Sequence, residues 1–322
     1  MNRRLPLGID IGTTRVRVAL AEKDDAGAAK LCAVVSRDLP DDFASLRAQA
    51  PELLAALMDD IVSELGTKER RCVLAIGAPE AAVRVIRFPR MSWAERLRAA
   101  SFEAQRFVSW DSSIASIVRV HPIDRAERLY AIGAVRQDAV APRVAAMKLA
   151  GLRVVGIDYD AFALRRALNQ ADAIVDIGYA RTLMHTFSAG GPLAWHVTAG
   201  GNDVTIGISQ ELSIDSSSAE KRKRILGSAG AGLSARRDLV AQIAGMIERA
   251  RARVPIERIA LTGNGARLPR LAAELEEASG AIVEIPVSEL LRTEAYPDDV
   301  VRAAAPDWTL AAGLASWSVC AS

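Results

Sequence analysis

Residues Leu7–Thr14 read LGIDIGTT, and residues Ile174–Gly178 read IVDIG. In both stretches an apolar strand reaches an aspartate, Asp10 or Asp176, and turns through a glycine into a second strand. One Asp-Ile-Gly turn is a weak signal, because aspartate and glycine are common in turns of every kind. Two such turns, each opening a similar series of elements, indicate that the chain is an internal duplication.

The elements that follow each turn come in the same order in both copies: two further strands, a helix, an apolar strand and a glycine-containing turn. The first copy places them at Arg15–Leu20, Lys30–Ser36, Leu46–Leu65, Cys72–Ile76 and Gly77–Pro79. The second copy places them at Thr182–Ser188, Leu193–Thr198, Arg237–Arg253, Arg258–Thr262 and Gly263–Ala266, with a further helix from about Leu268. This repeated order predicts two related α/β lobes with a cleft between them.

Residues 84–157 separate the two copies and have enough α/β content for a small subdomain. Helices are predicted at Ala94–Phe107 and Ala139–Ala150, and strands at Ile114–Val120, Leu129–Val135 and Val154–Ile157. We therefore predict a first lobe at 1–83, an inserted subdomain at 84–157 and a second lobe at 158–322, to which the C-terminal helix belongs unless it returns to the first lobe. Two stretches rich in serine, alanine and glycine, Ser213–Ala219 and Leu226–Ser234, are expected to be mobile surface segments.

Composition and charge exclude several classes of protein. The 322-residue chain has a net charge of only +2, whereas a surface that follows nucleic-acid phosphates needs a clear basic excess. The cysteines Cys32, Cys72 and Cys320 are odd in number and widely spaced, so we expect reduced thiols in a cytoplasmic protein. The longest uncharged stretch, Trp308–Ser322, is too short to span a bilayer, which predicts a buried helix and no direct membrane insertion.

The two aspartate turns carry residue types that suit a metal-bound polyphosphate. A tight turn with glycine presents backbone N–H groups to phosphate oxygens. Because Mg²⁺ keeps several waters and takes few carboxylates, Asp10 and Asp176 are candidate catalytic and Mg²⁺-binding residues, although either alone could be a hairpin cap. The phosphate-binding candidates at the turns are Gly12, Thr13, Thr14, Gly178, Tyr179, Ala180 and Thr182.

Two further glycine clusters suit the same ligand. Gly200 and Gly201 follow a strand of the second copy and are expected near the cleft, although a plain turn would look the same. Gly263, Asn264 and Gly265 lie between an apolar strand and a helix, where bare backbone lets a flat base approach. The chain has no Walker A motif and no Gly-x-Gly-x-x-Gly after a strand, which disfavours P-loop and Rossmann folds. The basic run Lys221–Arg224 is expected to be a solvated helical face.

With these motifs in place, the chain resembles the PilM family of type IV pilus assembly proteins, within the actin-like ATPase superfamily that also contains FtsA. The resemblance extends over nearly the whole chain in the right order. Beyond the three glycine turns, it rests on Val85–Met91, Ala150–Leu152, Val155–Asp158, Ala161–Leu164, Ala219–Lys223 and Ala311–Ala315. It implies an actin-like (ribonuclease H-like) α/β fold of duplicated βββαβα lobes with an inserted α/β subdomain.

The resemblance also implies a ligand and roles for residues. It implies ATP with Mg²⁺, with Glu220 and Lys223 near the ribose and base, Gly263 and Gly265 under the adenine, and Gly200 and Gly201 beside the phosphates. The chain departs from the family pattern at Asn264, where a third glycine is usual, so the base is expected to bind differently or more weakly. Slow ATP turnover or none is expected.

The partner implied by the resemblance is the short cytoplasmic tail of a PilN-like inner-membrane protein. The inserted subdomain would dock this tail, with links to pilus motor components, so that a cytoplasmic protein is held at the inner membrane. Self-association stays open. Phe88, Met91 and Phe102 are candidate pocket residues beside Arg87 and Arg90, although core packing and solvation suit them as well. The alternatives are a small-molecule kinase of the same fold, the cytoplasmic part of a type II secretion platform protein and an FtsA-like filament former.

Overall fold

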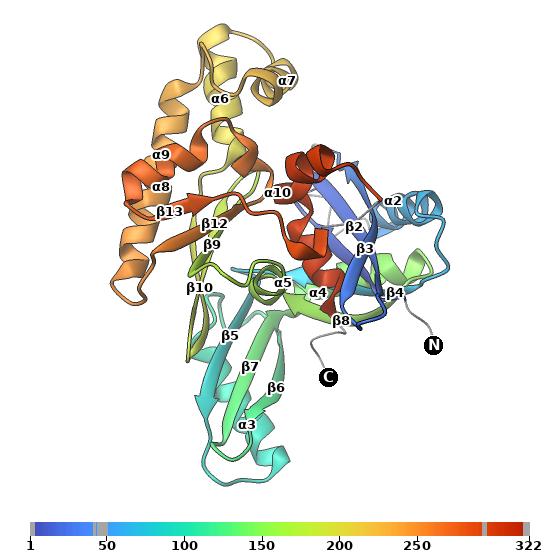
Figure 1. The fold of residues 1–322 in the computed structure, drawn as a ribbon. Coiled ribbons are helices and arrows are strands. Elements are labelled where there is room, and N and C mark those ends of the chain that lie inside the picture. Colours follow the sequence, from blue (N-terminus) through green and yellow to red (C-terminus); the bar gives the residue numbers. More distant parts are fainter. Residues whose placement is uncertain (1–3, 41–42, 44–50, 292–294, 318–322) are drawn as a thin grey trace. The chain divides into compact units, whose positions relative to one another are not determined.

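The computed structural model describes residues 4–40, 43, 51–291 and 295–317 and divides the chain into two compact units (Figure 1). The first unit takes in the chain up to Ala163, together with Phe187–Leu193 and the residues from Leu310 onward. The second unit consists of Leu164–Thr186 and Ala194–Thr309. Leu46, in the first predicted helix, and Cys320 lie outside the described residues.

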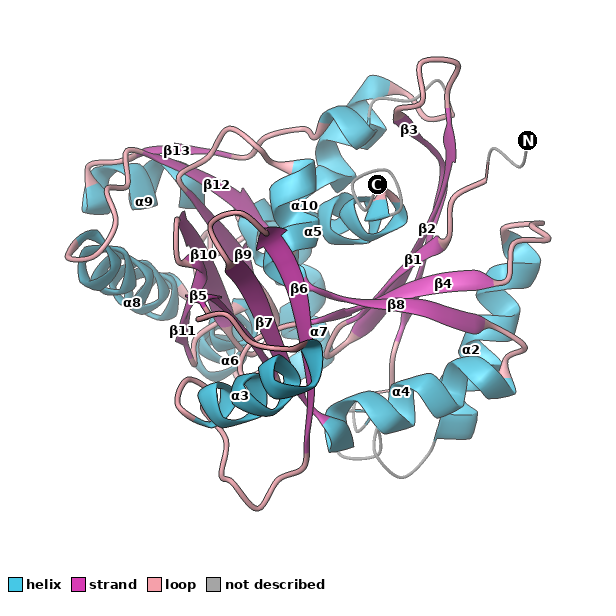
Figure 2. Ribbon diagram, turned by 90° about the horizontal axis from the view of Figure 1, so that it is seen from below, coloured by secondary structure: helices cyan, strands magenta, loops and turns pink. Residues whose placement is uncertain are grey.

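The first unit is built on a five-stranded sheet in the order β3-β2-β1-β4-β8. Its strands are β1 (Leu7–Ile11), β2 (Arg15–Lys23), β3 (Ala29–Asp38), β4 (Arg71–Ile76) and β8 (Arg153–Tyr159). Strand β2 is antiparallel to both β1 and β3, whereas β4 is parallel to both β1 and β8. Helices α2 (Pro51–Glu64) and α4 (Gln137–Leu149) pack on the sheet through Met58, Ile61 and Met147, which are fully buried (Figure 2).

A second sheet of the first unit lies in the sequence between β4 and α4. Its strands are β5 (Ala81–Arg87), β6 (Ser116–Asp124) and β7 (Leu129–Arg136), in the antiparallel order β5-β7-β6. Helix α3 (Trp93–Gln105) covers it through Ala100 and Ala104. In the edge strand β6 the register shifts between Pro122 and Asp124. The sheet joins the larger one through a shared apolar cluster that includes Ala81 and Tyr159.

The second unit repeats the five-stranded plan in the order β11-β10-β9-β12-β13. Its strands are β9 (Ala173–Ile177), β10 (Thr182–Ser188), β11 (Gly191–Val197), β12 (Arg258–Thr262) and β13 (Ile282–Glu284), of which the end of β10 and the start of β11, within Phe187–Leu193, are grouped with the first unit. Its helices are α6 (Gly201–Leu212), α7 (Ser216–Leu226), α8 (Leu233–Arg251) and α9 (Leu271–Ser279), with the 3₁₀ turns η1 (Asn264–Arg267) and η2 (Glu289–Leu291). Strand by strand, β9, β10, β11 and β12 correspond to β1, β2, β3 and β4. The repeated topology confirms the predicted duplicated α/β fold.

Two details of the predicted elements were wrong. The segment Ser213–Ala219 is a surface loop only at its start, because Asp215 caps α7 by accepting a hydrogen bond from the Ser218 amide at 3.0 Å. Ala219 is then fully buried in the core of the second unit. The helix expected from Leu268 begins at Leu271, since η1 fills the interval after Gly263.

The described cysteines are free thiols, as predicted. Cys72 is fully buried in β4, and burial raises the pKa of its thiol to about 12. A thiol that is neutral and enclosed in a core behaves as a small apolar side chain and is chemically inert. Cys72 is therefore a packing residue.

Helix α10 (Asp298–Ala315) ends in the first unit against β1. A β-carbon added to Gly8 would lie 2.2 Å from the Ala311 carbonyl oxygen and 2.4 Å from the Ala315 amide nitrogen. Gly8 thus lets helix backbone touch strand backbone. None of the described helices is both long and apolar enough to cross a lipid bilayer.

We predict that Gly8→Ala lowers the free energy of unfolding by about 1–3 kcal/mol, the usual cost of overpacking a core. Gly133→Ala is the matched control, because Gly133 also lies within a strand and a β-carbon there would meet nothing within 4 Å. Urea unfolding of both variants measures the difference. Equal stabilities would show that the end of α10 does not press on β1 in solution.

Candidate functional site

In the first unit, the candidate residues gather at the carboxyl ends of three parallel strands. β1, β4 and β8 run in the same direction, so Asp10, Gly77 and Asp160 follow one another along a single edge of the sheet. Open α/β sheets bind ligands at this edge. The sheet topology therefore brings the predicted Asp10 turn to a place suited to a ligand.

Asp10 faces an arginine across the β1–β2 hairpin. Residues Asp10 and Arg17 are register partners, and Arg17 Nη1 donates to Asp10 Oδ2 at 3.0 Å. Both side chains are largely buried, with 14% and 12% exposure respectively. A β-carbon at Gly12 would lie 3.3 Å from Arg17 Nη1, so the guanidinium lies beside the turn. Sequence reasoning missed Arg17, although its place opposite Asp10 could be read from the alternation of the return strand.

The glycine amides at the two turns are already engaged. Gly12 N–H donates to the Arg15 carbonyl at 2.9 Å, and Gly178 N–H donates to the Arg181 carbonyl at 3.0 Å. Each bond closes its own hairpin. In the first turn, no hydrogen bond among the described residues uses the amides of Thr13 and Thr14, and these are the N–H groups left for a ligand.

Asp160 is a second buried carboxylate at the edge that carries Asp10. It is 5% exposed, and its Oδ1 accepts a hydrogen bond from the Ala161 amide at 2.7 Å. A β-carbon at Gly77 would lie 1.8 Å from Asp160 Oδ2, so only glycine fits there. Sequence reasoning placed a turn at Gly77 but did not connect it with Asp160, because 82 residues of chain lie between them.

In the second unit, the turn at Asp176 is in direct contact with the glycine turn after β12. Gly263 has a φ of +79°, and a β-carbon there would lie 2.2 Å from Asp176 Oδ1. At Gly265 a β-carbon would lie 2.4 Å from Ile177 Cγ2. Between them, Asn264 is half-buried and opens η1. Gly263, Gly265 and Asp176 therefore share one small region of bare backbone.

Gly200 and Gly201 lie on the other side of the same turn, at the start of α6. Gly201 N–H donates to the Gly178 carbonyl at 2.9 Å, and Asn202 N–H donates to the Tyr179 carbonyl at 2.8 Å. A β-carbon at Gly200 would lie 2.5 Å from the Tyr179 carbonyl oxygen. The backbone of α6 can approach the turn this closely only because position 200 has no side chain.

Of the remaining turn residues, Thr182 is buried and Tyr179 and Ala180 are exposed. The Thr182 hydroxyl donates to the Ala199 carbonyl at 2.8 Å, which joins β10 to the segment before α6. Its hydroxyl group is thus used inside the fold.

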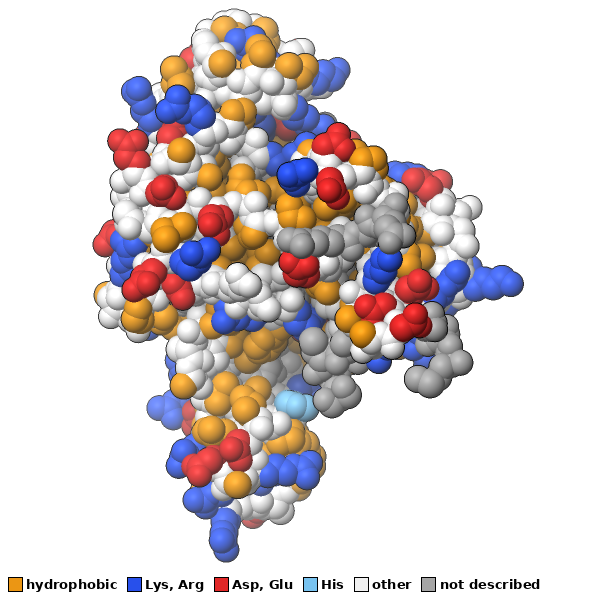
Figure 3. Space-filling view, viewed as in Figure 1, with side chains coloured by type: hydrophobic (Ala, Val, Ile, Leu, Met, Phe, Trp, Pro, Cys, Tyr) orange, Lys and Arg blue, Asp and Glu red, His pale blue; other side chains and the backbone are white. Residues whose placement is uncertain are grey.

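Lys223 and Glu220, on α7, extend the cluster to α6. Lys223 Nζ donates to the Gly201 carbonyl at 2.8 Å and to Thr205 Oγ1 at 2.7 Å, and it pairs with Glu220 Oε2 at 2.6 Å. The basic run Lys221–Arg224 is therefore only partly the solvated face that was predicted. Figure 3 shows basic and acidic side chains interspersed over the viewed face.

The electrostatics of this pair follow from its burial. Burial alone would raise the pKa of Glu220, but hydrogen bonds from Lys223 and Thr205, with the nearby positive charges, lower the pKa below its usual range. Burial lowers the pKa of the Lys223 ammonium, and the Glu220 carboxylate opposes that effect. An ionised carboxylate held beside Gly201 fixes α7 against α6.

Comparison with known proteins decides the family. The family model described as Type IV pilus assembly protein PilM matches residues 8–318. The chain belongs to the PilM family. A solved PilM-PilN type IV pilus biogenesis complex contains a chain 25% identical to this one, with a TM-score of 0.83 over 98% of this chain and 99% of that chain. No match was found among curated proteins.

A second solved structure supports the fold alone. The ethanolamine utilization protein EutJ from Carboxydothermus hydrogenoformans is 14% identical, with a TM-score of 0.62 over 97% of this chain and 90% of that chain. The fold of this PilM-family chain is actin-like, as the sequence predicted. The family match favours the hypothesis of a pilus assembly protein over the kinase, secretion-platform and FtsA-like alternatives.

We predict that Glu220→Gln destabilises the protein by about 1–3 kcal/mol at pH 7, the scale of a hydrogen-bonded charge. Because the folded-state pKa of Glu220 lies below the unfolded value, its contribution is fully present above about pH 4.3 and is lost as pH falls through the folded pKa. Urea unfolding of parent and variant from neutral to acid pH should therefore show converging stabilities.

Glu248→Gln is the control for this series, because Glu248 pairs with Arg251 on the exposed face of α8 and has 60% side-chain exposure. It should change stability by less than about 1 kcal/mol. A Glu220→Gln deficit that stays constant down to about pH 3 would contradict a role for the carboxylate charge.

Proposed function

We propose that this chain is an ATP- and Mg²⁺-binding scaffold of type IV pilus assembly that docks the cytoplasmic tail of a PilN-like inner-membrane protein. The observation that carries the nucleotide part is the contact of Gly263, Gly265, Gly178 and Gly200 around the Asp176 turn. There the glycine backbone packs closely beside a carboxylate, with no β-carbons in between. Backbone without side chains lets phosphate oxygens and flat bases come close to main-chain groups.

The residues present fit a nucleotide with its metal. Gly263, Asn264 and Gly265 would hold the base, and Glu220 and Lys223 would border the ribose. Thr13, Thr14, Tyr179, Ala180, Gly200 and Gly201 would approach the phosphates. Within the described residues no three histidine, cysteine or acidic side chains gather around one point, so Mg²⁺ would take most of its ligands from phosphate and water. Asp10 and Asp176 would bind its water shell.

Arg17 provides a positive charge beside the proposed phosphate-binding turn. Its guanidinium already pairs with Asp10 beside Gly12, and polyphosphate would offer it a second anionic partner. Bound Mg²⁺ would in turn offer Asp10 a cation. Exchange of partners at this pair couples nucleotide binding to the β1–β2 hairpin. We assign to ATP a role in setting partner affinity, with slow turnover or none.

The docking site for the tail is proposed where the three-stranded sheet of the inserted subdomain, β5-β7-β6, joins the five-stranded sheet of the first unit. There β8 is an edge strand, and an extended peptide can add to an open sheet edge through its backbone. Ile157 on β8 and Phe162 on α5 (Asp160–Ala167) are 38% and 36% exposed and can receive apolar side chains. Held in this way, the chain would work at the cytoplasmic face of the inner membrane.

The pocket residues predicted from sequence are distributed differently. Phe88 is 5% exposed and packs on Tyr130, so of its two predicted roles, pocket lining and core packing, the structure shows core packing. Phe102 is 71% exposed on α3. Arg87 pairs with Glu127 at 3.0 Å on the surface. Arg90 and Met91 line a hollow that lies away from β8.

We predict that Asp10→Ala and Asp176→Ala each weaken the Mg²⁺-dependent part of ATP binding by about 1–3 kcal/mol, because each removes a charged partner. Isothermal titration of ATP with and without Mg²⁺ measures this. Asp38→Ala is the control, since Asp38 is 67% exposed and its removal breaks an ion pair with Arg15 between β2 and β3. Absence of ATP binding to the parent would remove the nucleotide proposal, and unchanged binding by both variants would remove the two aspartates from it.

For the partner, a peptide of the PilN-like tail should bind the full chain, and Ile157→Glu should weaken binding at least about tenfold, ~1.4 kcal/mol, because a buried contact becomes a buried charge. Ile123→Glu is matched, because Ile123 is also exposed, at 54%, on the edge strand β6 of the same unit. Equal losses for the two variants, or none, would exclude docking at β8.

A further inference from the structure

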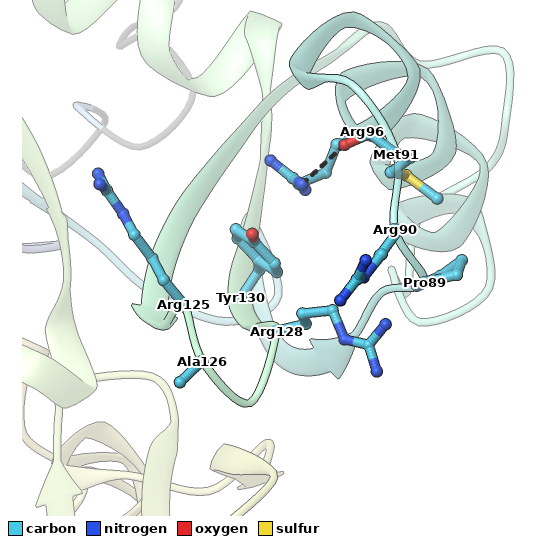
Figure 4. Close-up of a pocket in the computed structure, with 8 residues that line it drawn as sticks. All are labelled: Pro89, Arg90, Met91, Arg96, Arg125, Ala126, Arg128 and Tyr130. Carbon is cyan, nitrogen blue, oxygen red and sulfur yellow. Dashed lines mark hydrogen bonds between the residues drawn. The ribbon is translucent and has the colours of Figure 1, made fainter.

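A hollow of about 410 Å³ opens at the far end of the three-stranded sheet (Figure 4). Four of its lining residues are arginines, Arg90, Arg96, Arg125 and Arg128, set around Met91 and Tyr130. Strand β5 starts with Ala81 opposite Val135 and ends with Arg87 opposite Leu129. The hollow lies beyond this second end, whereas the proposed docking edge adjoins the first.

Three separate segments bring the arginines together. Arg90 follows β5, Arg96 lies in the first turns of α3, and Arg125 and Arg128 come from the β6–β7 hairpin. In Figure 4, Arg96 lies above the Tyr130 ring, with Arg90 and Arg128 to one side and Arg125 to the other. Figure 3 shows both basic and acidic side chains on the viewed face of the lowest part of the molecule. The fold therefore concentrates positive charge that is dispersed in the sequence.

No carboxylate of the described residues pairs with any of these four guanidinium groups. Glu127, on the same hairpin, pairs instead with Arg87 outside the hollow. Many other arginines of the first unit do have acidic partners, for example Arg15, Arg17, Arg37, Arg71, Arg136 and Arg143. Four like charges placed together without counter-charges repel one another, and an anion bound among them removes that cost.

Arg96 is held ready for such an anion. Its Nη2 donates to the Met91 carbonyl at 3.1 Å, and its Cζ lies 4.2 Å from the centroid of the Tyr130 ring. Its Nε is buried and has no hydrogen-bond partner. Stacking fixes the plane of the guanidinium, so little side-chain entropy is lost when an acceptor binds.

Arg128 stands at a backbone position that usually favours glycine or asparagine. Its φ is +56°, and its carbonyl accepts a hydrogen bond from the Phe88 amide at 3.1 Å. An arginine in the left-handed region costs conformational energy that a glycine would avoid. The residue that carries this backbone cost also contributes its side chain to the lining of the hollow.

We propose that this hollow binds an acidic peptide segment of a protein partner, with one glutamate or aspartate side chain entering between Arg96 and Arg128. Arginine forks match carboxylates in two-point hydrogen bonds, and Met91 and Tyr130 supply apolar contact for the side-chain stem. A concave site accepts a protruding side chain, whereas a flat membrane surface would contact convex parts of the protein. This interaction is separate from the nucleotide and the PilN-like tail.

The test uses the full chain and a fluorescein-labelled oligoglutamate peptide, with the oligoglutamine peptide as its uncharged counterpart. The glutamate peptide should bind, bind more weakly as salt is raised, and bind Arg125→Gln/Arg128→Gln at least about tenfold more weakly. Arg119→Gln/Arg153→Gln removes the same charge from exposed positions elsewhere in this unit and should stay within about twofold of the parent. Arg90→Gln provides an independent variant outside the hairpin.

Three results with the peptides would overturn the proposal: no binding of the glutamate peptide, equal binding of both peptides, or equal losses for the hollow and control variants. Vesicles of phosphatidylglycerol and phosphatidylcholine form a second arm. Stronger binding to vesicles than to peptide, lost in the same hollow variants, would assign the surface to lipid instead. ATP and tail-peptide binding by the hollow variants should match the parent, which keeps this test independent of the proposed function.

Discussion

A β-carbon at Gly263 would lie 2.2 Å from Asp176 Oδ1, and one at Gly200 would lie 2.5 Å from the Tyr179 carbonyl oxygen. These two close backbone contacts hold the turn after β12 and the start of α6 against the turn after β9. Without them, α6 could not start at the turn, and Lys223 could not reach the Gly201 carbonyl. The candidate site of the second unit is therefore a consequence of where side chains are absent.

In the first unit, the elements around the candidate site are packed closely by a buried ion pair as well as by glycine. Gly77 admits the Asp160 carboxylate, and the Asp10–Arg17 pair fills the space beside Gly12. A largely buried ion pair stays in place only while each charge has a partner. A ligand that offers both charges new partners can therefore change the state of the hairpin at small net cost.

Much of the fold could be predicted from sequence because its signals are local. Period-two alternation and Asp-Ile-Gly turns identified the strands, and β12 was placed at its observed bounds. The start of α7 was missed because Ser216–Ser218 looks like a loop until Asp215 is recognised as a cap. Two features could not be predicted from the sequence. The place of Asp160 depends on the order of strands in the sheet, and the arginine hollow depends on the register of β5, β6 and β7. The role of Lys223 was predicted only through family resemblance, since the residues that it contacts, Thr205 and Gly201, lie 18 and 22 positions earlier in the chain.

The exposed edges of the first unit are not equally protected against unwanted strand pairing. In β6, Pro122 lacks an amide hydrogen, the register shifts beside it, and Asp124 adds a charge, all of which obstruct the addition of another strand. In β8 the register also shifts, near Val155, but Val154–Ile157 contains no proline and no charge. An edge of this kind is an aggregation hazard in a chain that lacks its partner. If the proposed tail pairs with β8, it covers this edge, so co-expression with the partner should raise the yield of soluble protein and the cell would have a reason to match the amounts of the two proteins.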